Sequence, residues 1–425
     1  MTETVEAHDR TDPSSHPWAP AAATVETYAE CQEVLLNRAF ENYPCSPGSA
    51  AVWGDVITTS NGEIHVGKRR WLAPLVSRSA IQRFDVEVLD RAMHEYLVER
   101  WPEGASEHRV DLIWLIRGLL VPVAGGLVGI DGVMGDEERA KELLGYVDRF
   151  QTGGPLLRYA TVPREPLVQD ALDASAAFVE AFFRPSRKRR VALVAEHQAG
   201  QLALEDLPHD LITRQLLSGP EGFWDAGSEV REALTMLAGG LQTTAVSVAQ
   251  SLDAYLNWPD RSPDDVDDPD LMRAVVNETL RVNTVVEYLP RRTTQDVTLK
   301  SGRTIPAGTE VIVNLFLANR DPAVFGPDAE VFRPNRYVEL PPHYPQYGLA
   351  FGAGPHLCIG RPLVTQGGTD PRETCIPRIV PKILTELLRR GVQLAPDQEP
   401  SAEATYRRML KTYPVVFPKL ETAAR

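Results

Sequence analysis

The chain has 425 residues, of which 43% are hydrophobic and 24% are charged, and its formal net charge is −14. The length allows a sizeable core, and the composition is that of an ordinary globular protein rather than of a low-complexity or disulfide-rich one. The negative charge argues against a nucleic-acid or anionic-membrane binder, because its long-range field repels phosphates. Four cysteines without a C-x-x-C pair indicate reducing conditions, so we expect a cytoplasmic protein.

The first third of the chain contains a polar lead and one basic helix. Residues 1–16 are acidic and polar and lack an apolar core segment, so we expect a disordered lead rather than a signal peptide. Helical periodicity starts at Thr27–Asn37. In GEIHVGKRRW, His65 and Arg69 are four residues apart and share a helix face. Lys68 and Arg70 widen it, and this basic face is either solvated or a binding site for a pair of carboxylates.

The middle third predicts helices and loops without a chemical motif. An apolar helical pattern runs from Asp111 to about Leu144 and breaks at GIDGVMGD. An arginine and a proline inside this pattern favour a buried, broken helix over a membrane span. Residues 151–164 are loop-like, and Ala171–Phe183 and Asp210–Leu217 are helical. We interpret the run RPSRKRR at 184–190 as a solvated loop or helix end, with a nucleic-acid or targeting patch as the alternative.

The stretch from Ser228 to Asn257 predicts the longest helix, since it holds 30 residues without a proline. Such a helix is roughly 45 Å long. It is mostly apolar, yet its centre reads AGGLQTTA, where Gly239 and Gly240 each cost about 1 kcal/mol relative to alanine. Either a flat ligand against the backbone or a close helix–helix contact would explain these glycines.

The last third begins with a predicted helix, Asp270–Val282, and continues with a segment whose residue pattern is typical of strands. Glu278 lies on the apolar stripe of this helix, where a carboxylate needs a partner. Arg281, three residues on, can supply one, and a second arginine would complete a buried pairing; a surface ion pair is the alternative. After Pro290, β-branched alternation between turn residues predicts short strands.

The string FGAGPHLCIG places one cysteine, Cys358, in a loop with three glycines. A cysteine thiolate binds haem iron and supplies the electron density that favours O–O cleavage. Gly352, Gly354 and Gly360 would let the backbone approach a flat cofactor, and Phe351 would shield the sulfur from water. Taken alone, a cysteine in such a loop is more often a small buried residue.

The string resembles the haem-ligand loop of the cytochrome P-450 family, F-x-x-G-x-x-x-C-x-G, and further motifs follow the family's order from about Thr27 to Phe417. The resemblance implies a mostly α fold with small β-sheets, in which haem lies between the long central helix and the cysteine loop. It implies a single haem domain over residues 17–420, with a tail at 421–425.

The family's site residues are carried over to matching positions of this chain. The resemblance implies that Cys358 ligates the iron of haem b, and that the loop residues Phe351, Gly352, Gly354 and Gly360, with Gly239 and Gly240 on the long helix, contact the haem. The expected propionate ligands are His65, Arg69, Arg291 and His356. ETLR matches E-x-x-R, so the expected structural triad is Glu278, Arg281 and Arg336. The candidates for the substrate pocket are Leu241, Val285, Val286 and Tyr288.

Two departures from the family pattern affect the chemistry. The long helix usually carries (A/G)-G-x-(D/E)-T, in which the acid and the threonine relay protons. Here Gln242 replaces the acid before Thr243 and Thr244, and an amide has no pKa near neutrality. After Cys358, glycines and prolines interrupt the long helix that family members have, which leaves the docking of an electron donor open.

The resemblance implies a soluble haem-thiolate monooxygenase. It would insert one oxygen atom of O2 into a C–H bond of a small organic substrate, which we expect to be a secondary metabolite. Electrons would come ultimately from NAD(P)H through a ferredoxin-type partner, and we expect a monomer without a nucleic-acid or membrane partner. Oxidative coupling, a peroxide-driven reaction and a non-catalytic haem-binding accessory or sensor protein are the alternatives that Gln242 leaves open.

Overall fold

The computed structural model describes residues 22–99, 106–217, 226–338, 346–365, 378–403 and 409–419. These residues form mostly helices with small β-sheets, as the sequence predicts. The expected lead at residues 1–16 and tail at residues 421–425 lie outside the described residues. None of the helices in the described ranges is long and apolar enough to cross a membrane.

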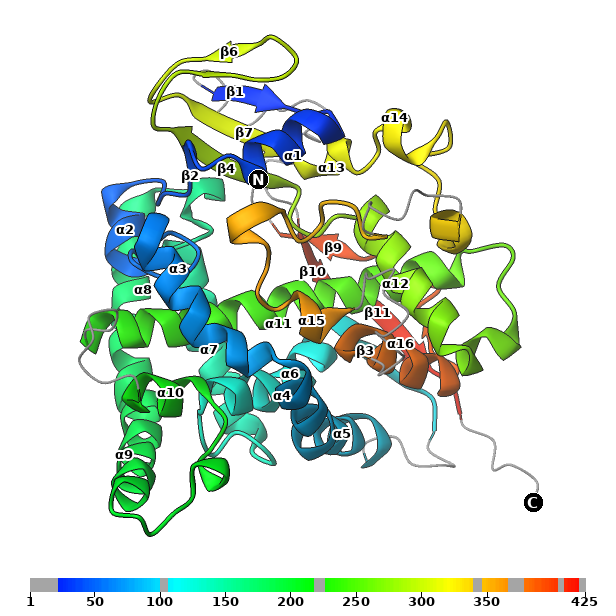
Figure 1. Cartoon of the computed structure of the whole chain (residues 1–425). Coiled ribbons are helices and arrows are strands. Elements are labelled where there is room, and N and C mark those ends of the chain that lie inside the picture. Colours follow the sequence, from blue (N-terminus) through cyan, green and yellow to red (C-terminus); the bar gives the residue numbers. More distant parts are fainter. Residues whose placement is uncertain are drawn as a thin grey trace. The chain divides into compact units, whose positions relative to one another are not determined.

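The chain divides into two compact units. Unit 1 comprises residues 1–43, 103–113 and 243–425, and unit 2 comprises residues 44–102 and 114–242. The longest helix, α11 (Ala226–Leu256), contributes residues to both units and is labelled in Figure 1. It starts two residues before and ends one residue before the bounds that the sequence predicts. The expected single domain over residues 17–420 stays a prediction.

Unit 1 contains a four-stranded sheet in the order β1-β7-β4-β2. Strand β1 (Ala22–Val25) pairs in parallel with β7 (Glu310–Asn314), and β7 is antiparallel to β4 (Tyr288–Thr293). Strand β2 (Phe40–Glu41) completes the sheet by pairing with β4. The strands expected after Pro290 are therefore present, and they pair with segments from the start of the chain.

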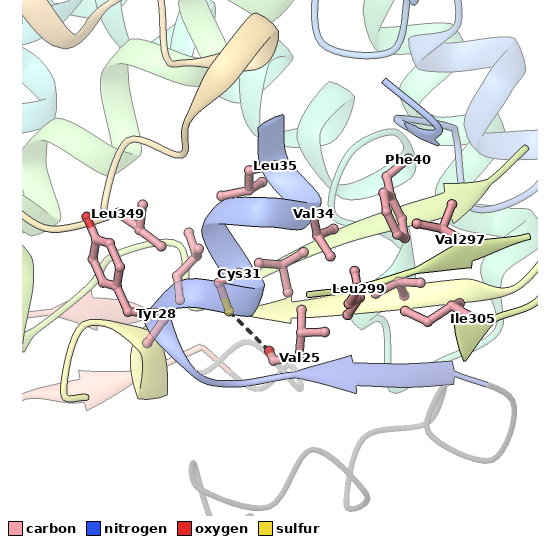
Figure 2. Close-up of a cluster of buried hydrophobic side chains, with 14 of the residues drawn as sticks. Val25, Tyr28, Cys31, Val34, Leu35, Phe40, Val297, Leu299, Ile305 and Leu349 are labelled. Carbon is pink, nitrogen blue, oxygen red and sulfur yellow. Dashed lines mark hydrogen bonds between the residues drawn. The ribbon is translucent and has the colours of Figure 1, made fainter. Parts of the chain in front are cut away.

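Helix α1 (Tyr28–Leu36) packs its apolar side onto this sheet. Thr27 caps the helix by accepting a hydrogen bond from Glu30 N. Figure 2 shows the resulting cluster, in which Val25, Cys31 and Val34 are fully buried. The Cys31 thiol donates to the carbonyl of Val25, and burial raises its pKa, so it is a neutral core side chain. This packing fixes the end of α1, which contacts the cysteine loop.

The remaining elements of unit 1 include helix α12 and three smaller sheets. Helix α12 packs against α16 and against the 3₁₀ turn at Pro334–Val338. The helices are α12 (Pro269–Val282), α13 (Leu315–Ala318), α14 (Pro322–Phe325), α15 (Arg361–Val364) and α16 (Ile379–Arg389), and the strands are β3 (His108–Asp111), β5 (Val297–Thr298), β6 (Thr304–Ile305), β8 (Gln393–Leu394), β9 (Ser401–Ala402), β10 (Leu410–Thr412) and β11 (Pro414–Phe417).

Unit 2 is helical throughout its described residues. Its helices are α2 (Pro47–Trp53), α3 (Gly62–Leu72), α4 (Arg78–Phe84), α5 (Asp90–Met93), α6 (Leu112–Val128), α7 (Glu137–Gly153), α8 (Arg164–Phe178), α9 (Arg184–Gln198) and α10 (Leu211–Leu217), with α6 starting two residues inside unit 1. The expected break at GIDGVMGD falls between α6 and α7. The loop expected from residue 151 begins three residues later, because α7 continues to its cap at Gly154.

The basic run at 184–190 forms the first turns of α9 and is mostly paired with acids. The helix end expected at Phe183 is wrong, because a π-helical turn at Val179–Phe183 joins α8 to α9. Arg190 is 7% exposed and lies 2.9 Å from a carboxylate oxygen of Asp210, and Arg187 lies 3.0 Å from Glu229. Charges neutralised in this way favour a structural role over a nucleic-acid patch.

Candidate functional site

The cysteine loop is a compact turn whose thiol is exposed. Cys358 N donates to the carbonyl of Phe351 over 2.9 Å, which closes the loop, and the Cys358 side chain is exposed. Phe351 stacks edge-on against Tyr347, with ring centroids 4.9 Å apart, and Arg361 donates to the Tyr347 hydroxyl over 3.0 Å. An ideal Cβ at Gly360 would lie 3.8 Å from the Cys358 sulfur. The glycine therefore leaves one side of the sulfur open to a ligand.

Gly352 and Gly354 shape the loop, and their expected contact with a haem stays a prediction. Both have left-handed backbone angles, with φ of +71° and +68°. A Cβ at Gly354 would lie 2.6 Å from the carbonyl oxygen of Leu35, at the end of α1. The close approach to α1 therefore requires a glycine at position 354.

Glu278, Arg281 and Arg336 are in direct contact and buried. Glu278 Oε1 lies 2.7 Å from Arg281 Nη2 and 3.0 Å from Arg336 Nε, and the three side chains are at most 4% exposed. Arg336 also pairs with Asp328, and hydrogen bonding to Arg336 lowers the pKa of that carboxyl. The geometry favours the buried pairing over the surface ion pair that the sequence left open.

A second buried network holds the segment after the cysteine. The Thr365 hydroxyl donates to Asn277 Oδ1 over 2.8 Å, and Asn277 Nδ2 donates to Gln346 Oε1 over 2.9 Å. Asn277 is fully buried on α12, next to Glu278. Helix α15 ends at Val364, one turn after the loop, so these side chains anchor its end. In this chain these hydrogen bonds hold a segment that a longer helix after the cysteine would otherwise hold.

Replacing Asn277 with leucine is expected to lower the free energy of unfolding by about 1–3 kcal/mol, because Thr365 and Gln346 lose their partners in a buried place. Urea denaturation followed by circular dichroism measures the change. Asn257→Leu is the matched control, since its amide bonds to Asp253 at an exposed site. Equal effects of the two variants would contradict the anchoring role.

Arg291 is a buried cation in need of an anion. It is 5% exposed on β4, and burial lowers its pKa to about 10, so it stays charged at neutral pH. Its side chain donates to the Pro290 carbonyl, and no carboxylate pairs with it among the residues that the structure describes. Leu289, two residues before it and therefore on the same face of the strand, lies 3.7 Å from an ideal Cβ at Gly352 in the cysteine loop. A negatively charged group bound beside this loop would satisfy the arginine.

His356 has a fixed ring orientation. Its Nδ1 lies 2.9 Å from Asn42 Nδ2, and the two residues are 314 positions apart in the chain. Because an amide nitrogen only donates, Nδ1 accepts and the ring proton is on Nε2. Nε2 is thereby a hydrogen-bond donor for an anionic group near the cysteine.

The expected pair His65 and Arg69 lies on α3 in unit 2. His65 is 3% exposed, and burial together with Arg69 lowers its pKa to about 4, so the imidazole is neutral at pH 7. Lys68 does not belong to the expected basic face, because it is buried and its Nζ lies 3.3 Å from Glu232 Oε2. Arg70 is exposed.

The centre of α11 is open at both glycines. Gly239 and Gly240 are exposed although the residues on either side of them are buried, and an ideal Cβ at either position would meet no atom within 4 Å. This open space favours the flat-ligand explanation over helix–helix contact, because packed helices would place atoms there. Gln242 is 8% exposed, Thr243 is half-buried and Thr244 is 5% exposed.

The four pocket candidates differ in their surroundings. Leu241 is fully buried in unit 2 and Tyr288 is 3% exposed on β4 of unit 1. Val285 and Val286 are half-buried in the turn that leads into β4. Their part in a substrate pocket stays a prediction.

The structure adds polar residues that the sequence reasoning missed. Asn42 and Gln346 gave no local signal, since their partners are distant in the sequence. Glu232 and Thr235 could have been found, because they continue the spacing of Gly239 and Gln242 along one helix face. Gln151 Nε2 donates to the Ala238 carbonyl over 2.7 Å.

Comparisons with known proteins identify similar sequences over part of the chain. The cytochrome P450 family model matches residues 260–366. The chain is 43% identical over 103 residues to cytochrome P450 71A23 from Arabidopsis thaliana, covering 23% of this chain and 21% of that protein. It is 33% identical over 154 residues to mycinamicin VIII C21 methyl hydroxylase from Micromonospora griseorubida, covering 36% of each. The matched stretches thus span well under half of these relatives' own length.

Solved structures share the fold over nearly the whole chain. P450BioI in complex with an acyl carrier protein ligated to hexadec-9Z-enoic acid is similar with a TM-score of 0.70 and 20% identity, covering 93% of this chain and 92% of that one. Substrate-free CYP109E1 from Bacillus megaterium is similar with a TM-score of 0.70 and 20% identity, covering 96% of both chains.

The fold is therefore that of the cytochromes P450. The family match includes α12 with Glu278 and Arg281, as well as the cysteine loop.

Proposed function

We propose that the chain is a haem-thiolate monooxygenase that inserts one oxygen atom of O2 into a C–H bond of a small organic molecule. The observation that carries the proposal is Arg291, a buried cation without a carboxylate partner among the described residues, on the strand face beside the cysteine loop. A haem would supply propionates for this cation. The match to a methyl hydroxylase supports C–H oxidation, and its name supports a natural-product substrate.

Residues of unit 1 fit a haem b group. Cys358 would ligate the iron, since its sulfur is exposed and has an open side at Gly360. Arg291 and the Nε2–H of His356 would bind propionates in unit 1. For His65 and Arg69, the same role follows from the sequence resemblance alone. The open backbone at Gly239 and Gly240 would accept the flat ring. The bound haem supplies the redox-active iron that activates dioxygen.

The chain's own groups would control protons, substrate and electrons. Thr243 would hold a proton at its hydroxyl, whereas the Gln242 amide can only donate and accept hydrogen bonds. Leu241, Val285, Val286 and Tyr288 would contact an apolar substrate. Electrons would come from NAD(P)H through a ferredoxin-type partner. Cytoplasmic location and a monomeric state stay predictions from the sequence.

Oxidative coupling is the second candidate reaction, and Gln242 favours it. A substrate with its own O–H or N–H groups can supply protons where the chain has an amide in place of an acid. The product would then lose two hydrogens instead of gaining an oxygen.

A spectrum and a product analysis test the proposal. The ferrous protein with carbon monoxide is expected to show the strongly red-shifted Soret band of a thiolate ligand. A library of natural products is then screened for spectral shifts, and the hits are incubated with NAD(P)H, a surrogate ferredoxin and its reductase. A mass gain of one oxygen supports hydroxylation. If the red-shifted Soret band is present but no product forms, the chain is an accessory or sensor protein. If the red-shifted band is absent, the proposal is refuted.

Haem binding is expected to take up a proton at His65. The pKa of His65 without a bound anion is about 4, below the ordinary 6.5. A propionate beside the ring favours imidazolium and raises the pKa, so uptake occurs between about pH 4 and 6.5. Calorimetric titration of haem-depleted protein in two buffers of different ionisation enthalpy measures it. His65→Gln should remove this uptake, and an unchanged uptake in that variant would contradict the assignment.

A further inference from the structure

A fully buried asparagine, Asn319, follows the short helix α13 of unit 1. Each of its four polar atoms has a hydrogen-bond partner. The backbone N–H donates to Leu315 O over 2.9 Å, and the carbonyl accepts from Arg281 Nη1 over 2.7 Å. The side-chain Oδ1 accepts from Leu349 N over 2.6 Å, and Nδ2 donates to Thr284 Oγ1 over 2.9 Å. Asn319 therefore joins α13 to two segments that are distant in the sequence.

The orientation of the Asn319 amide follows from its two partners. The Leu349 N–H can only donate, so it must face the amide oxygen, and the amide nitrogen is left for Thr284. Because this nitrogen can only donate, the Thr284 oxygen accepts, and the Thr284 hydroxyl gives its own proton to the carbonyl of Arg281 over 3.1 Å. One amide thus connects the chain just beyond α12 with the segment that leads into the cysteine loop.

Gly348 lets the chain approach this amide closely. Its backbone is left-handed, with φ of +59°, and an ideal Cβ there would lie 2.3 Å from Asn319 Oδ1 and 2.9 Å from Asn319 Cγ. The amide cannot move aside without losing its bonds to Leu349 and Thr284. A side chain at position 348 would therefore break the contact between Asn319 and the segment before the cysteine loop.

Backbone hydrogen bonds connect Leu349 with the cysteine. The Leu349 carbonyl accepts from Gly352 N over 2.7 Å, and the carbonyl of Phe351, two residues further on, accepts from Cys358 N over 2.9 Å. Leu349 is 2% exposed, whereas the Cys358 side chain is exposed. The thiol is thus carried by a loop whose buried end is held by the side chain of Asn319.

We propose that Asn319 is a positioning residue for Cys358. Its amide attaches the buried end of the cysteine loop to the chain just beyond α12, and this attachment keeps the thiolate in place on the iron. The inference rests on the proposed haem-thiolate function and adds to it a residue outside the loop. Arg281 bonds to the backbone carbonyl of Asn319, so the task of the Asn319 side chain is separate from the buried Glu278 network.

Asn314, at the other end of α13, separates positioning from general stability. It is also fully buried, and its Oδ1 caps the helix by accepting from Leu317 N over 3.0 Å. Among the residues that the structure describes, its side chain makes no hydrogen bond to the cysteine loop. Asn314→Ala and Asn319→Ala therefore both remove a buried amide from the same short helix, but the second variant also detaches the loop.

The test follows the spectrum of the ferrous carbon-monoxide protein over time. We expect Asn319→Ala to speed the loss of the red-shifted Soret band roughly 10-fold or more, the scale on which loss of an outer-shell partner weakens a metal site. Asn314→Ala should lower the urea midpoint of unfolding to a similar extent but leave this rate unchanged.

Thr284→Val is a milder variant that removes the acceptor of the Asn319 amide and keeps the shape of the side chain. It should raise the rate of band loss by a smaller factor, because Thr284 acts on the loop through Asn319. Adding it to Asn319→Ala should then raise the rate no further. If the two factors instead multiply in the double variant, Thr284 acts independently of Asn319, which would contradict the inference.

Hydrogen exchange of the purified protein gives a readout that needs no turnover. The peptide that contains Leu349 should exchange its amide hydrogens faster in Asn319→Ala than in Asn314→Ala, because the Leu349 N–H loses its acceptor. Equal exchange in the two variants, or equal rates of band loss, would overturn the inference. If the wild type itself lacks the red-shifted band, the proposed function fails instead, and the exchange experiment still decides whether Asn319 holds the loop.

Discussion

Glu278→Gln is expected to lower the free energy of unfolding by about 3–5 kcal/mol, the cost of leaving a buried charge uncompensated. Glu278 accepts from Arg281 Nε over 2.8 Å and from Arg336 Nε over 3.0 Å, and both arginines are buried. The Arg281 guanidinium otherwise donates mainly to the carbonyls of Asn319 and Ala329. A neutral amide would therefore leave two guanidinium groups with Asp328 as their one carboxylate partner among the residues that the structure describes.

Urea denaturation followed by circular dichroism measures this loss. Glu180→Gln is the matched control, because Glu180 pairs with Arg184 at the surface, where both side chains are more than 60% exposed. An exposed pair contributes about 0–1 kcal/mol. A loss below about 1 kcal/mol in Glu278→Gln would show that the network does not stabilise the fold.

The sequence predicts those parts of the fold that depend on local periodicity. The bounds of α11 follow from a long stretch without proline. The apolar stripe of α12 follows from side-chain spacing, because a helix buries one face at 3.6-residue intervals. Gly239 and Gly240 were singled out by their cost to a helix, and the structure opens space at both. The same reasoning wrongly predicts a helix end between α8 and α9. The cationic run at 184–190 favours a solvated loop as long as its acidic partners are unknown.

Residues whose partners are far apart in the chain could not be predicted. Asn42 orients His356 across 314 positions, and no local pattern marks such a contact. Gly354 is required by the end of α1, which only the folded chain brings near. Lys68 seemed to widen a basic face, yet it turns inward to Glu232. Contacts between distant parts of the chain determine whether these side chains are buried. The local sequence cannot show this, because a solvated and a buried cation can have the same spacing to their neighbours.

Replacing Cys358 with serine is expected to abolish the red-shifted Soret band of the ferrous carbon-monoxide complex, because a serine hydroxyl is a hard, weak donor to iron. Turnover should fall by more than the roughly 10–100-fold that loss of an outer-shell partner costs a metal site. The free energy of unfolding should change little by comparison. The Cys358 side chain is exposed, and the loop is held by the Cys358 N–H bond to Phe351 O, which serine keeps.

Cys45→Ser separates this effect from a general loss of thiols. Cys45 is a partly exposed cysteine of unit 2, outside the loop, so its replacement should leave the band and turnover unchanged. Haem content, measured as the pyridine haemochrome, distinguishes a changed ligand from an empty protein. A Cys358→Ser protein that retained the thiolate band would show that another cysteine ligates the iron. That result would remove the basis on which Arg291 and His356 are assigned to the propionates of a haem beside this loop.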